Sequence, residues 1–232
     1  PWEPDVSPLL ITATDCLDTS VMGSDLVYII VPTPSVDRRM DSAHVERVLG
    51  ELPPFSGLVV VGSTLDPKEA RRLCDGDRIV YSPPLIRLGH VIYDLENMQV
   101  ALVGTKNPDR VRMLQDLWRW APMTHVVQGD PTTIAVAKLA INASLSQKIA
   151  WANEVARVAE SQGADSTVVL RAVGADPRIG SACMRRGFPP GGPCLPRDLD
   201  AWLALSHELF AMADKASIGH GVMRRKIIEE IL

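Results

Sequence analysis

Three short apolar runs decide the fold, and each of them ends in small or turn-forming residues. They read LVYIIVPTP over residues 26–34, LVVVGST over residues 58–64 and RIVYSPP over residues 78–84. Near-continuous runs of β-branched residues are typical of strands that are buried on both faces, as in parallel sheets. Weaker candidates for strands follow at residues 100–103 and 125–128.

Amphipathic stretches separate these runs and carry Pro or Ser near their starts, as helices often do. They span residues 42–52, 67–73 and 108–119. Short apolar runs that alternate with such stretches predict an α/β fold with a mainly parallel sheet.

The pattern changes after Asp130. Residues 131–162 contain no Gly, and no Pro after the first position, and their apolar residues recur every three or four positions, which predicts one long helix ended by Gly163. A second helix is expected at residues 166–173, then a loop rich in Gly and Pro at residues 175–196, then further helix from residue 197 to 232.

The composition excludes several classes of protein. With 46% hydrophobic residues, 22% charged residues and a net charge of -4, the sequence is that of an ordinary globular protein and a poor partner for nucleic acid. No apolar run approaches the ~20 residues of a membrane span, and the first residues do not resemble a signal peptide. The four cysteines lack metal-ligand spacing, so we expect no metal site and reduced thiols in a cytoplasmic protein.

The segment GFPPGGPCLPRD, residues 187–198, carries the candidate chemistry. It places Cys194 at the start of a helix, where the helix N-terminus favours a thiolate. A thiolate can attack an aldehyde to give a thiohemiacetal, from which hydride can leave to a nicotinamide. The spacing alone also permits a buried structural cysteine followed by Asp198 as a helix-capping residue.

This segment resembles the Gly-Gly-Ser-Cys-Phe-Pro-Lys-Asp motif of the UDP-glucose and GDP-mannose dehydrogenases. The resemblance extends backwards through GADPRIG at residues 174–180, Asn153-Glu154 and KLAIN at residues 138–142. It continues in the first half with the motifs that end the three strands and with Tyr93-Asp94. In order and spacing it covers nearly the whole sequence.

The resemblance implies two domains and a set of partners. Residues 1–129 would form a Rossmann-like NAD-binding sheet whose N-terminal part is incomplete, because no Gly-x-Gly-x-x-Gly turn is present. Residues 130–232 would form an all-α domain that carries the cysteine loop and dimerises through the helix at residues 131–162. Both ends of the sequence look cut relative to the family, whose substrate is a nucleotide sugar.

The resemblance also implies roles for single residues. Cys194 would be the nucleophile, Lys138 and Asn142 would flank the carbon that is oxidised and stabilise its oxyanion, and Asp198 would handle a proton. Thr64 is a further catalytic candidate that also lines the cofactor. The remaining candidates are Pro32, Thr33 and Arg197 for NAD, and Arg178 and Gly191 for the substrate, Arg178 serving the neighbouring subunit.

The sequence departs from the family at two carboxylates. Pro84 and Leu88 stand where the family has Glu, one of which is expected to act on the water that hydrolyses a thioester. Three prolines, at positions 189, 190 and 193, also stiffen the loop before Cys194.

Three functions therefore remain open. The first is the four-electron oxidation of the C6 alcohol of a nucleotide sugar to the uronate, with NAD. The second is a degenerate, non-catalytic homologue that serves as a dimerising or binding module. The third is a two-electron sugar or hydroxyacid dehydrogenase that needs no thioester hydrolysis.

Overall fold

The computed structural model describes residues 16–206 apart from residues 22 and 75. A five-stranded sheet forms the centre of its first half. The expectations for residues 1–15 and 207–232 lie outside the described residues. The strands are β1 (Leu26–Ile29), β4 (Leu58–Val61), β5 (Ile79–Tyr81), β6 (Val100–Gly104) and β7 (His125–Gly129), in the spatial order β1-β4-β5-β6-β7. All five predicted strands are confirmed, with ends that differ by at most two residues.

The sheet is mixed. Strands β1, β4 and β5 run parallel, and so do β6 and β7, but β6 pairs antiparallel with β5 through Tyr81 and Gly104. The prediction of parallel pairing was wrong at this one pair. The chain leaves β5 and enters β6 at the same end of the sheet, so no crossover intervenes and the direction must reverse.

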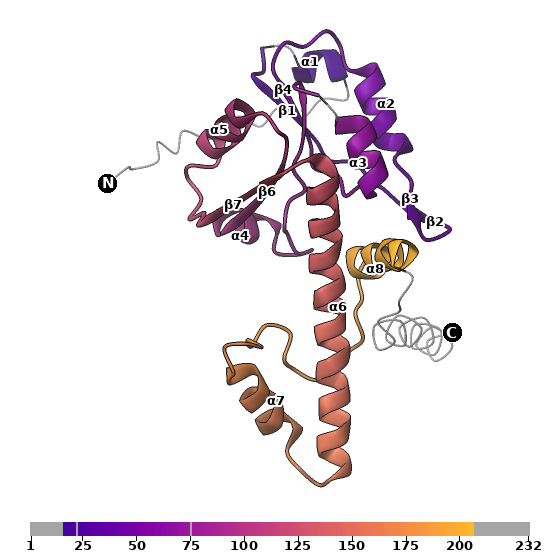
Figure 1. Cartoon of the computed structure of the whole chain (residues 1–232), viewed down its shortest axis with the longest axis vertical. Helices are drawn as coiled ribbons and strands as arrows, with labels where there is room; N and C mark the ends of the chain where they lie inside the picture. The colour runs from indigo at the N-terminus through magenta and orange to yellow at the C-terminus, as the bar shows by residue number, and fades with distance from the viewer. Residues whose placement is uncertain (1–15, 22, 75, 207–232) are drawn as a thin grey trace.

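Both faces of the sheet are covered, as the continuous apolar runs predict (Figure 1). In β4 the side chains alternate: Val61 packs with helices α2 and α3 on one face, whereas Leu58 and Val60 pack with α5 on the other. These helices are α2 (Ala43–Glu51), α3 (Pro67–Cys74) and α5 (Pro108–Leu117).

The predicted long helix is present as α6 (Pro131–Ser161). Asp130 caps it by accepting a hydrogen bond from the Thr133 amide. Its first turns belong to the core of the sheet, because Ile134 and Ala135 pack with residues of α2, β4 and α3. Its later turns leave the sheet and pack against α7 (Ser166–Ala175) (Figure 1).

The cysteine loop ends earlier than predicted, because α8 (Cys194–Leu205) begins at the cysteine itself. Pro196 lies in the first turn of α8, where a missing amide donor costs no intrahelical hydrogen bond. Leu199 and Leu203 of α8 pack on Ala143 of α6. The two helices thus form one packed pair beside the sheet.

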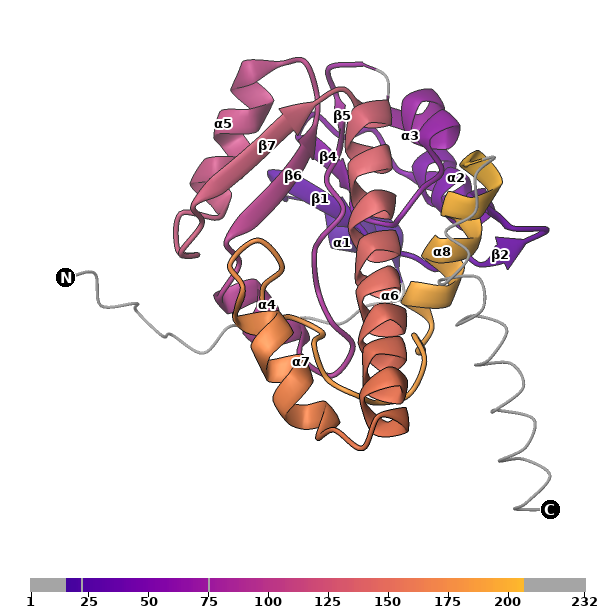
Figure 2. The same cartoon turned by 60° about the horizontal axis from the view of Figure 1, so that its bottom comes forward.

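Four short elements were not predicted from the sequence. Two are the strands of a hairpin, β2 (Ser35–Val36) and β3 (Arg39–Met40), and two are the helices α1 (Leu17–Val21) and α4 (Val91–Glu96). Figures 1 and 2 both place the hairpin beside α8.

Candidate functional site

Two polar side chains of α6 face α8 and are almost fully buried. Lys138 is 7% exposed and Asn142 is 9% exposed, and they lie one helical turn apart on the same face. The Lys138 ammonium donates a hydrogen bond of 2.9 Å to the carbonyl oxygen of Pro84, in the segment that follows β5. Lys138 therefore connects the helical half to the carboxyl end of the sheet.

Asp198, in the first turns of α8, completes this pair. Its side chain is fully buried, and Oδ2 accepts a hydrogen bond of 2.5 Å from the Asn142 amide nitrogen. Its other oxygen, Oδ1, lies 2.8 Å from Nε and 2.7 Å from Nη2 of Arg197. A buried carboxylate with these partners is satisfied on both oxygens.

Arg197 continues the network to the sheet. Its Nη1 lies 3.4 Å from the carbonyl oxygen and 3.3 Å from the hydroxyl of Thr33, which is buried just beyond the end of β1. Lys138, Asn142, Asp198, Arg197 and Thr33 thus form one cluster, which we call the polar cluster. It joins α6, α8 and the carboxyl end of β1.

Cys194 begins α8 at the edge of the polar cluster, with its side chain exposed. Burial lowers the pKa of Lys138, and electrostatic interaction with Asp198 and Cys194 partly offsets that shift. Lys138 is therefore coupled electrostatically to both ends of the first turns of α8.

The structure does not bring all predicted site residues into contact. Thr64 is half-buried after β4, and among the described residues it makes no hydrogen bond with the polar cluster. Pro32 is exposed next to Thr33, and Gly191 lies half-buried in the loop before α8. Arg178 follows α7, is 87% exposed and pairs with Asp176 at 2.6 Å.

Two further groups at this site had no distinctive signal in the sequence. One is the Pro84 carbonyl, a backbone atom that no side-chain pattern marks. The other is Tyr81, which is fully buried at the end of β5 and whose hydroxyl accepts a hydrogen bond from the Leu65 amide at 3.1 Å. Burial raises the pKa of the Tyr81 phenol. The charges of Asp198 and Arg197, both in the polar cluster, also act on the Tyr81 phenol.

An apolar cavity of about 350 Å³ opens on the other side of Pro84. Its walls come from the ends of β1 and β5, the start of β6, helix α4 and the end of α5. The lining includes Tyr28, Pro84, Leu85, Leu95, Trp118 and Trp120. The positions where the family has two Glu are here a proline in the cavity wall and Leu88, which is 77% exposed.

Three groups of α6 hold the loop between α7 and α8. Lys148 donates a hydrogen bond of 2.9 Å to the carbonyl oxygen of Ile179, Asn153 accepts one of 2.9 Å from the Gly187 amide, and Glu160 pairs with Arg186. The approach to Cys194 is therefore attached to the long helix at several turns.

Within residues 16–206, leaving aside 22 and 75, no group of three or more His, Cys, Asp or Glu could hold a metal ion. None of the helices in this part of the protein is both long and apolar enough to cross a membrane.

Comparisons with known proteins show similarity in both sequence and fold. Residues 132–217 match the model of the UDP-glucose/GDP-mannose dehydrogenase family, central domain. The UDP-glucose 6-dehydrogenase TuaD of Bacillus subtilis is 28% identical over 88% of this chain and 47% of its own length. The UDP-glucose 6-dehydrogenase of Drosophila melanogaster is 30% identical over 82% of this chain and 45% of its own.

A solved structure gives the same result. A UDP-glucose dehydrogenase from Pyrobaculum islandicum superposes with a TM-score of 0.75 and 26% identity, over 94% of this chain and 55% of that one. The chain spans about half the length of the relatives it matches. The predicted resemblance is confirmed, and the chain belongs to the UDP-glucose/GDP-mannose dehydrogenase family.

Proposed function

We propose that this chain carries the reacting groups of an NAD-dependent nucleotide-sugar 6-dehydrogenase, which oxidises a C6 alcohol to a carboxylate through a thioester on Cys194. The observation that carries the proposal is the polar cluster. Asp198 lies 56 positions from Asn142 in the sequence, yet the two side chains form a buried hydrogen bond near the start of the helix that begins with Cys194, and the charge of Asp198 acts on Lys138.

The residues near the end of β1 fit the nicotinamide end of NAD. Thr33 and Arg197 offer a carbonyl, a hydroxyl and a guanidinium at the carboxyl end of a parallel strand, which is where dinucleotides bind in such sheets. Pro32 and Thr64 lie at the same edge of the sheet, after β1 and β4. NAD, when bound, supplies the acceptor for one hydride, so two NAD molecules in succession would take the two hydrides that leave the sugar.

The side chains divide the chemistry between them. As C6 loses its first hydride, the hydroxyl proton passes to Lys138 in its neutral form, which its lowered pKa makes accessible. The Cys194 sulfur then adds to the aldehyde carbon, and the Lys138 ammonium and the Asn142 amide stabilise the oxyanion. Loss of the second hydride leaves a thioester, and water replaces sulfur at the carbon to give the carboxylate and a free thiol.

The last step lacks a positioned base. Hydrolysis needs a water that loses its proton beside the thioester, yet position 84 is a proline and position 88 an exposed leucine. Of the carboxylates expected at this site only Asp198 remains, and both of its oxygens already accept hydrogen bonds. Loss of a general base typically slows a step by 10²–10⁴-fold.

Rapid mixing of the protein with NAD and UDP-glucose tests this proposal. We expect a burst of NADH followed by little turnover, with a sugar adduct on Cys194 visible by intact mass. Cys194→Ala should give no adduct and only the NADH of the first hydride transfer, because that step precedes the attack by sulfur. Steady turnover without an adduct would assign the base to another residue. If wild type and Cys194→Ala both give no NADH, the non-catalytic function is favoured.

The proposal includes a homodimer through α6. Two observations support it: Val136, Trp151 and Val158 are exposed on α6, and the Arg178 side chain is largely exposed, as an arginine that serves a neighbouring copy would be. Sedimentation of wild type and Trp151→Glu measures it. A mass that is monomeric and equal for the two would contradict the dimer.

A further inference from the structure

The hairpin β2–β3 connects β1 to α2 and contacts α8. We call residues 33–41 the strap. Its two turn residues, Asp37 and Arg38, have φ angles of 49° and 62°, so the turn is of the left-handed kind that matches the twist of a tight hairpin. The amide of Asp41 donates to the carbonyl oxygen of Pro34 at 2.8 Å and closes its base.

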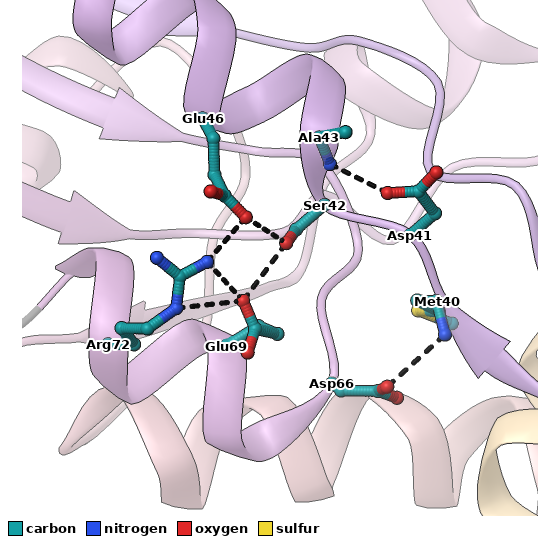
Figure 3. A network of polar contacts seen from close by, with 8 residues as sticks. All are labelled: Met40, Asp41, Ser42, Ala43, Glu46, Asp66, Glu69 and Arg72. Carbon is teal, nitrogen blue, oxygen red and sulfur yellow. Dashed lines mark hydrogen bonds and ion pairs between the residues drawn. The ribbon is translucent and has the colours of Figure 1, made fainter.

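One edge of the strap is held by α2 and α3 (Figure 3). The Met40 amide donates to Oδ2 of Asp66 at 3.2 Å. Asp66 directly precedes α3, and its carbonyl oxygen accepts a hydrogen bond from the Ala70 amide. Its carboxylate, which at this position often caps the helix, binds the strap. Just beyond the strap, Ser42 donates to Glu46 at 2.8 Å and to Glu69 at 2.9 Å.

This attachment continues into an ion-pair network. Arg72 of α3 contacts both Glu46 of α2 and Glu69, as Figure 3 shows. The C-terminal end of the strap therefore cannot shift without separating groups of two helices that lie on the sheet.

The strap also contacts α8. The Met40 side chain is buried between Leu139 of α6 and Ala201 of α8. At the opposite end of the strap, Thr33 accepts from Arg197. Figures 1 and 2 agree in placing β2 and β3 along α8. The strap thus touches α8 near its first turn and again near its middle.

We infer that the strap positions α8, with Met40 and Asp66 as positioning residues that hold Cys194 and Asp198 against Lys138 and Asn142. Within the described residues, α8 packs on α6 through Leu199 and Leu203, and Ala201 packs with Met40 of the strap and Leu139 of α6. We expect the contacts with α6 alone to leave α8 free to rock about the axis of α6. Met40 opposes rocking by filling the space beside Ala201, and Asp66 holds the Met40 backbone in place. The inference rests on the proposed function only in treating Cys194 as catalytic.

Alkylation of Cys194 by iodoacetamide, followed for its own peptide by mass spectrometry, tests the inference without cofactor or sugar. Lys138→Met calibrates the assay, because it removes the positive charge beside the thiol. We expect Met40→Ala to slow alkylation at pH 7 by about threefold or more, in the direction of Lys138→Met. Met40→Leu, which refills the space, should restore the rate.

The matched control is Val111→Ala, which removes a buried side chain on the opposite face of the sheet. It should lower stability and leave the alkylation rate unchanged. Asp66→Ala should resemble Met40→Ala, and Asp66→Asn should restore the rate because an amide oxygen can still accept from Met40. Should Met40→Ala fail to fold, the Asp66 pair decides alone.

Rates in Met40→Ala and Asp66→Ala equal to that in Val111→Ala would overturn the inference. A missing NADH burst would overturn the proposed function and leave the alkylation result standing, so the two failures can be told apart.

Discussion

At the scale of residues, Lys138 places a charged group in an almost fully buried position. Within the part of the chain that the structure describes, its ammonium donates one hydrogen bond, to the neutral carbonyl of Pro84. Asp198 compensates part of the charge, but burial still lowers the pKa of Lys138. A buried charge costs stability, which fits the chemical role that we propose for Lys138.

Replacing Lys138 with Met should therefore separate stability from activity. Met fills a similar volume without a charge to desolvate, so we expect the free energy of unfolding to stay within about 2 kcal/mol of wild type, or to rise. The NADH burst should fall by about 10²–10³-fold, because the alkoxide loses its stabilising charge. Urea unfolding and stopped-flow absorbance measure the two effects. A large loss of stability would mean that Lys138 is a structural residue.

The pKa of Lys138 also sets a pH dependence. Between its lowered pKa in the folded protein and the ordinary value of 10.5, the unfolded chain binds more protons than the folded one. The free energy of unfolding attributable to Lys138 should therefore rise with pH across that window, and be lowest below it. Urea unfolding of wild type and Lys138→Met at a series of alkaline pH values gives the difference, and an opposite slope would contradict the lowered pKa.

At the scale of elements, two glycines close in sequence should respond in opposite ways to alanine. A Cβ at Gly57, just before β4, would overlap the carbonyl oxygen of Asp25 and the Phe55 ring. A Cβ at Gly50, inside α2, would meet nothing within 4 Å. Gly57→Ala should cost about 1–3 kcal/mol of stability, whereas Gly50→Ala should add about 0.5–1 kcal/mol. Thermal unfolding of both variants checks the contrast, and equal effects would contradict the packing before β4.

The elements that could be predicted are those whose pattern repeats. The strand β4 is four consecutive buried apolar residues, and α6 runs for eight turns without an internal glycine, so period and length identify both. The hairpin was missed because its strands have two residues each and its turn, Asp37-Arg38, contains no glycine. The antiparallel pair of β5 and β6 was missed because strand direction depends on the route of the connection rather than on the strand residues.

At the scale of the whole molecule, the site could be predicted in part. The motif that contains Cys194 and Asp198 and the motif that contains Lys138 and Asn142 belong to one family pattern, and the structure brings Asn142 and Asp198 into direct contact. No local pattern could show that Thr33 would reach Arg197, 164 positions away, or that the Pro84 carbonyl would hold Lys138. The first contact arises from the packing of α8 against the strap and the second from the packing of α6 against the end of β5, neither of which the sequence pattern describes.

The helix α6 takes part in two separate cores. Its 31 residues span about 46 Å at ~1.5 Å per residue. Ile134 and Ala135 are enclosed by the sheet and its helices, whereas Ala152 and Ala156, in the described part of the chain, pack with α7 and Met184. One continuous helix is therefore anchored strongly at its first turns and lightly at its last.

Backbone amides along α6 should accordingly exchange with deuterium in two regimes. Amides near Leu139 should open only with global unfolding. Amides near Ala156 should open through a sub-global fluctuation that releases α7. Because Lys148 and Asn153 hold the loop before Cys194, the same fluctuation should release that loop. Exchange at rising denaturant would resolve two opening energies within a single helix, and one shared value would contradict this. The far end of α6 would then set how often the approach to Cys194 loosens while the sheet stays folded.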